Sequence, residues 1–580
     1  MLKTKLSKQI RQRPLLVLLL FVSLAGILSL LVSQYSRKPS HTCEGQFDLA
    51  FIGAEIVDGL GQPSFRGDIG IKDQRIACIG SIDSKNVLKV VDSTGLTISP
   101  GFIDVHTHVE RNVPTHAPFL APNFLRQGVT TIITGNCGRS FSNITELFKL
   151  LEANGSNLNV ASLIGHNTIR SQVMQQDAAA PNPVQLAKMK ALAVAGMRGG
   201  ALGLSTGLEY IPGTFAKTNE LVELAKAIRV NGGLYVSHLR DEGPKAEAAI
   251  REAINIGERA GVQVHISHFK VQGPNQWGSA QARLDLVKSA EARGLRISVD
   301  QYPYVASSTG IAVLLPSWLS EGGLRAASLK LNDAATRRRV RDEMIEQLIA
   351  LGWNDYSFAK IAYCESDRSL VGLTIPEIAR IRGEAQPVPR RVSFQPARFG
   401  RPQSMRPNDE RSELEREADT VIDLYSHGGA QMVFFNMKED DVKTIMQDRE
   451  VMFGSDSGVR EENASVLPHP RGSGTFPRVL GVYAREQHLF SIEEAIRRMT
   501  SLPAETFGLK DRGQISPGYW ADLVVFDANR ILDTATYEKP MSNPIGIEYV
   551  IVNGSIVVDR GVITPQLPGM VLRRNALMRE

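Results

Sequence analysis

The chain has 580 residues, of which 43% are hydrophobic and 22% charged, so a wholly disordered chain is excluded and one large domain with a smaller companion is expected. Its formal net charge is only +5, and no long stripe of Lys and Arg accompanies it, which gives no support to nucleic-acid binding. The four cysteines form no CxxC pair or dense framework, so we expect disulfides to contribute little.

Residues 1–45 differ from the rest of the chain and are predicted to be a targeting segment with its linker. Basic residues precede an uncharged apolar run from Pro14 to Ser33. This run has about the length, roughly 20 residues, that a membrane-spanning helix needs. The stronger positive charge on its N-terminal side predicts an uncleaved transmembrane signal anchor, with the body of the protein exported to the periplasm or cell exterior. The alternative is a cleaved signal peptide, which would give a secreted protein.

Short β-rich stretches lie at both ends of the remaining chain, in residues 46–99 and 501–580. The stretches are Phe47 to Val57, Asp68 to Ile79, Ala521 to Asp527 and Tyr549 to Val558. Gly and Asp turns separate them, as is typical of antiparallel strands. We therefore predict a small β-sandwich domain that is built from both ends of the chain.

Between these ends, residues 100–500 alternate apolar strand-like runs with helical stretches. Such alternation is typical of the α/β class, and eight or nine strands suit a (β/α)8 barrel of the TIM type. The strand candidates are Gly101 to Val105, Gly128 to Thr134, Val160 to Gly165, Leu202 to Ser205, Gly233 to His238, Val262 to His268, Arg296 to Tyr302, Gln431 to Asn436 and Glu450 to Gly454.

Two insertions interrupt this alternation. Residues 305–355 carry no clear strand and are predicted to lie as a lid on the barrel face where loops build active sites. Residues 383–417 are rich in Pro and Arg, with five prolines spaced too closely for a helix. We expect this second insertion to be a solvated loop.

A His-x-His pair follows the first barrel strand. The apolar run from Gly101 ends at Val105 and leads directly into His106 and His108. Side chains repeat every two residues along an extended chain, so both imidazoles point to one side. Neutral imidazole is a favoured zinc ligand, and barrel active sites lie at the C-terminal strand ends. The pair predicts a metal site.

Four further metal-ligating side chains stand where later strands end. They are Cys137, His238, His268 and Asp456. Taken singly, a buried cysteine is usually a small hydrophobic residue, and a strand-terminal histidine is often a hydrogen-bonded core group. Six potential ligands in barrel order are difficult to explain as core filling. We predict that they form the metal centre.

These residues resemble the amidohydrolase superfamily and, within it, the D-aminoacylase (N-acyl-D-amino-acid deacylase) family. The resemblance runs from about Phe47 to the C-terminus, apart from the two insertions. Besides the His-x-His strand, it is carried by Gly135-Asn136-Cys137-Gly138, Gly203-Leu204-Ser205-Thr206-Gly207-Leu208-Glu209-Tyr210, Ser237-His238-Leu239-Arg240, Ser267-His268-Phe269-Lys270, Asp300-Gln301-Tyr302-Pro303-Tyr304, His469-Pro470-Arg471-Gly472 with the following Gly474 to Arg478, and Gly513 to Asp527.

The resemblance implies two kinds of metal ligand. A tightly held zinc in that family matches Cys137, His238 and His268, whereas the His-x-His pair and Asp456 match a second, weaker metal position. Many superfamily members bridge two metals with a carboxylated lysine, and Asn136-Cys137 stands here where one might be sought. We therefore expect one essential Zn²⁺, with thiolate in place of the lysine.

The resemblance also implies roles in catalysis and substrate binding. Asp456 is expected to take the proton of the attacking water and pass it to the leaving amine, which must be protonated to depart. An N-acylated amino acid presents a carboxylate, which an arginine can bind as a bidentate fork. The residues expected to bind it are Lys270, Tyr302, Tyr304 and Arg471. One departure stands beside the aspartate, where the family's usual Gly is Ser457.

The sequence thus predicts a zinc-dependent hydrolase that cleaves the linear amide of small-molecule N-acyl-D-amino acids to a carboxylate and a free D-amino acid. The D configuration rests on the resemblance alone. One alternative is a cyclic-amide hydrolase of the hydantoinase or dihydroorotase type, against which Cys137 and the long insertion argue. A second is a non-catalytic, membrane-anchored binding protein, which the intact ligand set disfavours. The acyl group, the side-chain preference and the oligomeric state stay open.

Overall fold

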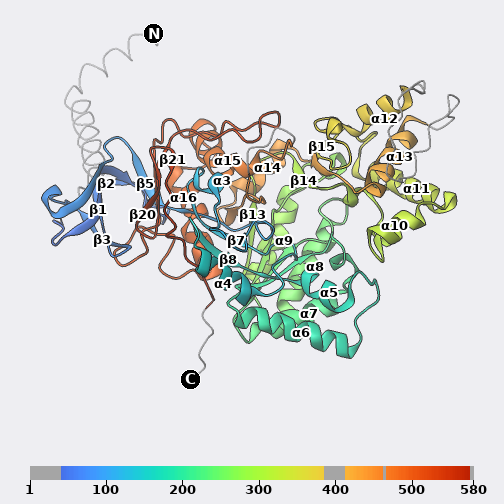
Figure 1. The fold of residues 1–580 in the computed structure, drawn as a ribbon, viewed down its shortest axis with the longest axis horizontal. Helices are drawn as coiled ribbons and strands as arrows, with labels where there is room; N and C mark the ends of the chain where they lie inside the picture. The colour runs from blue at the N-terminus through green and yellow to red at the C-terminus, as the bar shows by residue number, and fades with distance from the viewer. Residues whose placement is uncertain (1–40, 385–411, 461–465, 575–580) are drawn as a thin grey trace, which may run out of the picture.

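The computed structural model of the protein describes residues 41–384, 412–460 and 466–574. Figure 1 shows a β-rich domain at one end of the long axis, a barrel in the middle and an inserted α/β region at the other end. Among the described residues, no helix is long and apolar enough to cross a membrane. The predicted signal anchor falls in residues 1–40, outside the described residues.

Both ends of the chain contribute strands to one nine-stranded sheet. The strands are β1 (Phe47–Ile56), β2 (Phe65–Lys72), β3 (Arg75–Gly80), β4 (Val87–Asp92), β5 (Thr97–Pro100), β18 (Leu523–Phe526), β19 (Ile547–Val552), β20 (Ser555–Asp559) and β21 (Val562–Ile563). The two halves join where β5 pairs antiparallel with β18, with Ile98 opposite Val525. Phe51 and Leu523 pack in the same buried cluster as these two residues, so apolar burial from both ends holds the domain together.

A disulfide joins Cys43 to Cys78 of β3 and corrects the expectation that sulfur contributes little. Their Cα atoms are 5.9 Å apart, although 35 positions separate them in the sequence. Spacing along the chain does not reveal such a distance, because pairing of β1, β2 and β3 creates it. Cys137 and Cys364 are free and buried.

Eight parallel strand positions form the barrel wall, which confirms the predicted α/β fold of the TIM type. They are β6 (Phe102–Asp104), β7 (Val129–Thr134), β8 (Asn159–Ser162) with β9 (Ile164–Gly165), β10 (Gly203–Gly207), β11 (Leu234–His238), β12 (Val264–Ile266), β13 (Ile297–Gln301) and β17 (Val451–Phe453). Backbone hydrogen bonds connect the two arcs of this wall at both junctions, from Leu202 to Ser162 at 2.9 Å and from Asp456 to His106 at 2.8 Å. The carboxyl ends of all strands therefore meet at one face.

Helices cover the outside of the barrel (Figure 1). They are α3 (Pro122–Leu125), α4 (Ile144–Asn154), α5 (His166–Met174), α6 (Pro183–Arg198), α7 (Thr218–Arg229), α8 (Ala246–Ala260), α9 (Ala280–Ala292), α14 (Glu439–Gln447), α15 (Arg471–Arg478), the π-helical continuation Val479–Glu486, α16 (Ile492–Met499) and α17 (Ser501–Phe507). Local signals set their ends. Asn182 and Gln185 form a capping box with Pro183 at the start of α6, and Gly261 ends α8 in the left-handed region.

The region between β13 and α14 forms an insertion with its own sheet and core. Its strands β14 (Ser307–Gly310) and β15 (Ala359–Tyr363) both pair antiparallel with β16 (Gln431–Phe434). Its helices are α10 (Leu324–Lys330), α11 (Ala334–Leu351), α12 (Ile375–Glu384) and α13 (Glu413–Ser426). Side chains from these elements form one buried apolar cluster, so the insertion packs as a unit.

Two sequence predictions are wrong in this region. The run from Gln431 to Asn436 is not a barrel strand, because an apolar run indicates burial but not which sheet buries it. Ser307–Gly310 is a strand where no clear strand was expected, because Ser-Ser-Thr-Gly has no apolar alternation. Most of the Pro- and Arg-rich stretch, residues 385–411, lies outside the described residues.

Candidate active site

The predicted metal ligands lie at the carboxyl ends of barrel strands or in the turns that follow. They are His106 and His108 after β6, Cys137 after β7, His238 at the end of β11, His268 after β12 and Asp456 after β17. Three of these residues have a left-handed backbone, with φ of 50° at Cys137, 38° at His268 and 50° at Asp456. This conformation costs about 1 kcal/mol or more for a residue with a side chain, and it clusters at functional sites.

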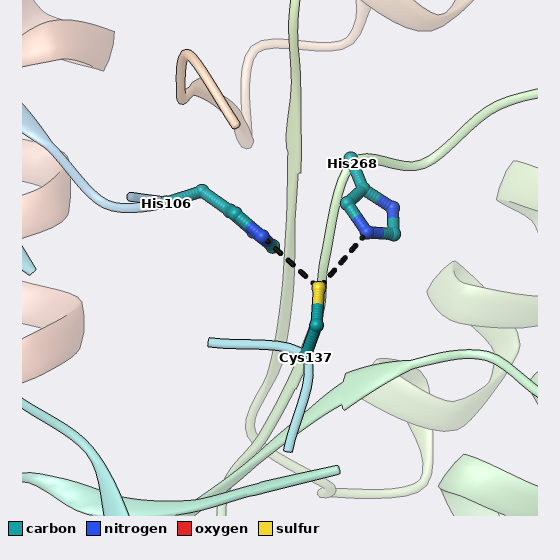
Figure 2. Close-up of side chains that lie close together, drawn as sticks. All are labelled: His106, Cys137 and His268. Carbon is teal, nitrogen blue, oxygen red and sulfur yellow. Dashed lines mark hydrogen bonds between the residues drawn. The ribbon is translucent and has the colours of Figure 1, made fainter. Parts of the chain in front are cut away.

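The first ligand group forms around the thiol of Cys137. Its Sγ is 3.3 Å from Nε2 of His106 and 3.5 Å from Nε2 of His268, and Figure 2 shows both rings directed at the sulfur. Nδ1 of His238 is 3.6 Å from the same sulfur and 2.7 Å from Nε2 of His268. One sulfur and one nitrogen of each histidine therefore converge on a common point.

The second ligand group contains Asp456 and the His-x-His pair. Oδ1 of Asp456 is 3.0 Å from Nε2 of His108 and 3.6 Å from Nε2 of His106. His106 thus uses the same nitrogen to face Asp456 and Cys137. The sequence placed His106 in the second group alone, whereas the geometry places it between both groups.

The chemistry of the first group fits a metal ion that accepts both nitrogen and sulfur ligands. Burial raises the pKa of the Cys137 thiol well above its usual value, because desolvation disfavours the thiolate. A metal cation would supply the positive charge that a buried thiolate requires. Burial and the nearby Lys270 ammonium lower the pKa of His268 to about 3, so its imidazole is neutral, as ligation demands.

Carboxylates contact the ring nitrogens that face away from the first group. Oε2 of Glu209 is 2.9 Å from Nε2 of His238, and Oε1 of Glu242 is 3.0 Å from Nδ1 of His268. Such contacts fix the orientation and tautomer of a ligating histidine. Glu209 stands in one of the motifs that carry the resemblance, but no pattern in the sequence indicates its contact with His238. Glu242 stands outside the quoted motifs, and only the fold reveals its position.

Asp300 anchors the histidine that the two groups share. Its Oδ2 is 2.7 Å from Nε2 of His265 and 3.6 Å from Nδ1 of His106. Burial alone would raise the pKa of Asp300, but the hydrogen bond with His265 and the charge of both histidines outweigh it and lower the pKa. An ionised carboxylate therefore lies beneath the metal ligands. Asp300 belongs to the quoted motif that contains Tyr302, and sequence analysis did not assign it a role.

Lys270 is buried and engaged within the protein. Its Nζ donates a hydrogen bond of 2.5 Å to Oε1 of Glu242 and lies 2.8 Å from Nδ1 of His268. The Lys270 ammonium also keeps the pKa of Glu242 low, against the effect of burial. The predicted substrate contact thus competes with an existing ion pair. In this structure, Lys270 contacts the nitrogen of His268 that faces away from Cys137.

Arg471 lies beside the second group. Its Nη1 is 2.8 Å from Oδ2 of Asp456, and its Nη2 donates to the carbonyl of Ser308 at 3.1 Å. The guanidinium carbon lies 4.7 Å from the centre of the Tyr302 ring. Ser308 is part of β14, so the insertion reaches the active site here. Arg471 consequently connects the insertion, Tyr302 and the acidic ligand.

The two predicted tyrosines lie in different surroundings. Tyr302 lies between Arg471 and Lys270, whose Nζ is 5.7 Å from the ring centre. Tyr304 instead packs on His469, with ring centres 5.0 Å apart, and lies near Arg478. The hydroxyl groups of both tyrosines are buried without a hydrogen-bond partner among the described residues. The arrangement favours Tyr302 over Tyr304 for substrate contact.

Comparison with known proteins identifies the family. A sequence model described as the amidohydrolase family matches residues 89–558. The chain is 34% identical to a D-aminoacylase and 32% identical to an N-acyl-D-glutamate deacylase, both from Alcaligenes xylosoxydans xylosoxydans, with 91% and 92% of this chain and 98% and 97% of those proteins covered.

A solved structure gives the same result. The N-acyl-D-glutamate deacylase from Bordetella bronchiseptica, in complex with zinc and a phosphonate inhibitor, superposes with a TM-score of 0.74 at 30% identity. The match covers 91% of this chain and 100% of that one. The resemblance to the D-aminoacylases is therefore confirmed, and the chain belongs to the amidohydrolase family of metal-dependent hydrolases.

Proposed function

We propose that this enzyme is a zinc-dependent N-acyl-D-amino-acid deacylase, which hydrolyses a linear amide to a carboxylate and a free D-amino acid. The observation that carries the proposal is the position of Asp456. One of its oxygens contacts His108 and the other contacts Arg471. A proton acceptor, metal ligands and a cation for an anionic substrate therefore meet at a single carboxylate. The similarity to D-aminoacylases and N-acyl-D-glutamate deacylases supports the substrate class.

Cys137, His238 and His268 would hold the zinc, with His106 beside them. The histidine nitrogens and the thiol sulfur are the ligand types that zinc takes in proteins. When bound, zinc supplies a Lewis acid that polarises a carbonyl oxygen and activates water. The second group, which contains His108, would form a weaker position for another metal ion. We therefore expect one tightly bound zinc per chain.

Asp456 would act as the general base and then as the general acid. Burial alone would raise its pKa, but the charge of Arg471 and the nearby histidines holds it well below its usual range. The carboxylate is therefore ionised and able to accept a proton from the attacking water. The same group would then protonate the leaving amine, so that the free amino acid departs.

Arg471 would bind the carboxylate of the substrate. Its Nε and Nη1 have no hydrogen-bond acceptor among the described residues, although Nη1 is ion-paired with Asp456. A guanidinium can offer two parallel donors to a carboxylate. The ring of Tyr302, against which the guanidinium packs, would hold Arg471 in position. Lys270 would be a second contact if its ammonium binds the substrate carboxylate as well as Glu242.

We also propose that the catalytic body lies on the exported side of a membrane. The basic and apolar N-terminal sequence supports this location. The pairing of Cys43 with Cys78 supports it independently, because disulfides persist mainly in oxidising compartments. Cell fractionation with protease accessibility tests the proposal, and a body protected from external protease in cells with a permeable outer envelope would contradict it.

The deacylase proposal is tested by zinc content together with hydrolysis of paired N-acetyl-D- and N-acetyl-L-amino acids. We expect zinc near one per chain and turnover of the D series, with both lost in Cys137→Ala. Cys364→Ala is the matched control, because Cys364 is also a free, buried cysteine but lies in the core of the insertion. A zinc-loaded protein that opens cyclic amides and leaves both linear series intact would instead establish the cyclic-amide alternative.

A further inference from the structure

Arg460 lies near the proposed carboxylate site, and its side chain has no ion-pair partner among the described residues. It lies four positions after Asp456 and is partly exposed. Its Nε is buried without a hydrogen-bond acceptor, and its side chain forms no ion pair with any residue in the part of the chain that the structure describes. In contrast, Arg471 is paired with Asp456, and Lys270 is paired with Glu242. Of these three cations, Arg460 is therefore the one without an ion pair to a described carboxylate.

The backbone holds Arg460 next to Arg471. A Cβ atom added to Gly472 would lie only 2.9 Å from Nε of Arg460, so the arginine side chain lies directly on that glycine. Asn123 fixes both segments: its Oδ1 accepts a hydrogen bond from the Arg460 amide at 3.1 Å, and its Nδ2 donates to the Gly472 carbonyl at 2.8 Å. A side chain at position 472 would crowd this contact, and Arg460 therefore lies against the residue that follows Arg471, close enough for the two charges to interact.

Among the described residues, the carboxylate that acts on both guanidinium groups is that of Asp456. Burial and the neighbouring charge of Arg471 lower the pKa of Arg460 to about 10, so it stays protonated at neutral pH. Asp456 is the nearby carboxylate, and it already contacts Arg471. Two close guanidinium groups that share one carboxylate repel each other, and a further anion between them removes that repulsion. The arrangement is therefore suited to a substrate with more than one negative charge.

We propose that Arg460 binds a second carboxylate of the substrate, so that the preferred substrates are N-acyl derivatives of acidic D-amino acids. This inference rests on the proposed function, in which Arg471 takes the α-carboxylate. An acidic side chain would then reach Arg460, whereas a neutral side chain would leave it unpaired. Overall similarity does not decide between these classes, because the chain is 34%, 32% and 31% identical to a D-aminoacylase, an N-acyl-D-glutamate deacylase and an N-acyl-D-aspartate deacylase.

N-acetyl-D-glutamate and N-acetyl-D-glutamine provide a matched test, because they have nearly the same shape and differ in one carboxylate. We expect the full-length, zinc-loaded enzyme to prefer the glutamate by about 10- to 100-fold in kcat/KM, as a charged hydrogen bond provides. Arg460→Met should remove this preference and leave hydrolysis of the glutamine nearly unchanged. Arg460→Lys should keep part of it. Arg293→Met is the control, because Arg293 pairs with Glu258 on the outside of the barrel and should change neither substrate.

Three results would overturn the inference: equal hydrolysis of both substrates by the native enzyme, a preference for glutamate that survives in Arg460→Met, or an equal loss on both substrates in that variant. Thermal unfolding of each variant shows whether it is folded. Failure of the deacylase proposal has a separate signature, which is no hydrolysis of either substrate. Arg460 is then judged by calorimetric binding of D-glutamate and D-glutamine, where the same preference and the same loss are expected.

Discussion

The two ligand groups share His106 but differ in their surroundings. In the group around Cys137, the cysteine, His238 and His268 are 4%, 3% and 2% exposed. In the other group, the side chains of His108 and Asp456 are 30% and 12% exposed. The first group is enclosed by protein, whereas the second is more exposed to solvent. We therefore expect the first group to hold the metal and the second to take part in the reaction.

The two groups also differ in the contacts that their histidines make on the side away from the proposed metal position. His238 and His268 each have a carboxylate on the nitrogen that faces away from the thiol. For His108, the described contact is with Asp456 itself. A carboxylate behind a ligand histidine raises its basicity and fixes its ring, which strengthens metal binding. We therefore expect metal to bind more tightly to the first group than to the second.

The largest effect is expected for a substitution of Asp456, which should lower the reaction rate without removing the metal. Asp456→Asn keeps the size of the side chain but removes its ability to accept a proton. We expect kcat to fall by about 10²- to 10⁴-fold, the range for loss of a general base. Zinc content should stay near one per chain, because the first group is intact. Elemental analysis alongside amine release checks both, and loss of the tightly bound zinc in this variant would place Asp456 among its essential ligands.

The next effect tests whether the carboxylate behind His238 supports the metal. Glu209→Gln should keep the hydrogen bond but lose the charge, and we expect zinc affinity to fall by about 10- to 100-fold. Competition with a chelator measures this change. Glu223→Gln is the control, since Glu223 pairs with two lysines away from the site. Unchanged zinc affinity in Glu209→Gln would show that its contact with His238 has no effect on the metal.

A smaller effect is expected for Arg471, which is proposed to bind the substrate carboxylate beside the second group. Arg471→Lys retains one positive charge but cannot form a bidentate contact with a carboxylate. We expect KM to rise by about tenfold, equivalent to about 1.4 kcal/mol, with the first group still loaded with zinc. Steady-state kinetics on one N-acetyl-D-amino acid provide the measurement. If kcat falls and KM stays constant, Arg471 serves mainly to keep Asp456 ionised.

The sequence was sufficient to predict the barrel and to place the candidate ligands at the ends of its strands. Apolar runs such as Val129–Thr134 and Val451–Phe453 lead to residues that can bind metal, here Cys137 and Asp456, and their order along the chain follows from periodicity. The sequence was not sufficient to predict contacts that depend on the direction in which a side chain points. Glu209, Glu242 and the dual position of His106 result from how neighbouring strand ends face one another.

The insertion shows the same limit at the level of whole strands. The run at Gln431 is as apolar as a barrel strand but pairs with Ser307–Gly310, a polar segment that periodicity does not reveal. That short strand then brings the carbonyl of Ser308 to Arg471. A prediction that omitted this strand could not place the insertion against the active site. Local patterns specify elements well, but partners far apart in the chain are specified by packing.

The smallest expected effect on the site lies in the β domain, far from both ligand groups. Cys43→Ser removes the disulfide with Cys78, whose loop of 35 residues predicts a free energy of unfolding lower by about 2–4 kcal/mol. Because this bond joins only the start of the chain to β3, we expect kcat/KM and zinc content to stay unchanged at temperatures where the protein is folded. Denaturant unfolding and amine release measure the two properties, with Cys364→Ser as the control for loss of a buried thiol. An equal loss of activity and stability would show that the β domain supports the ligand groups, and the contrast between the two groups would then depend on the whole fold.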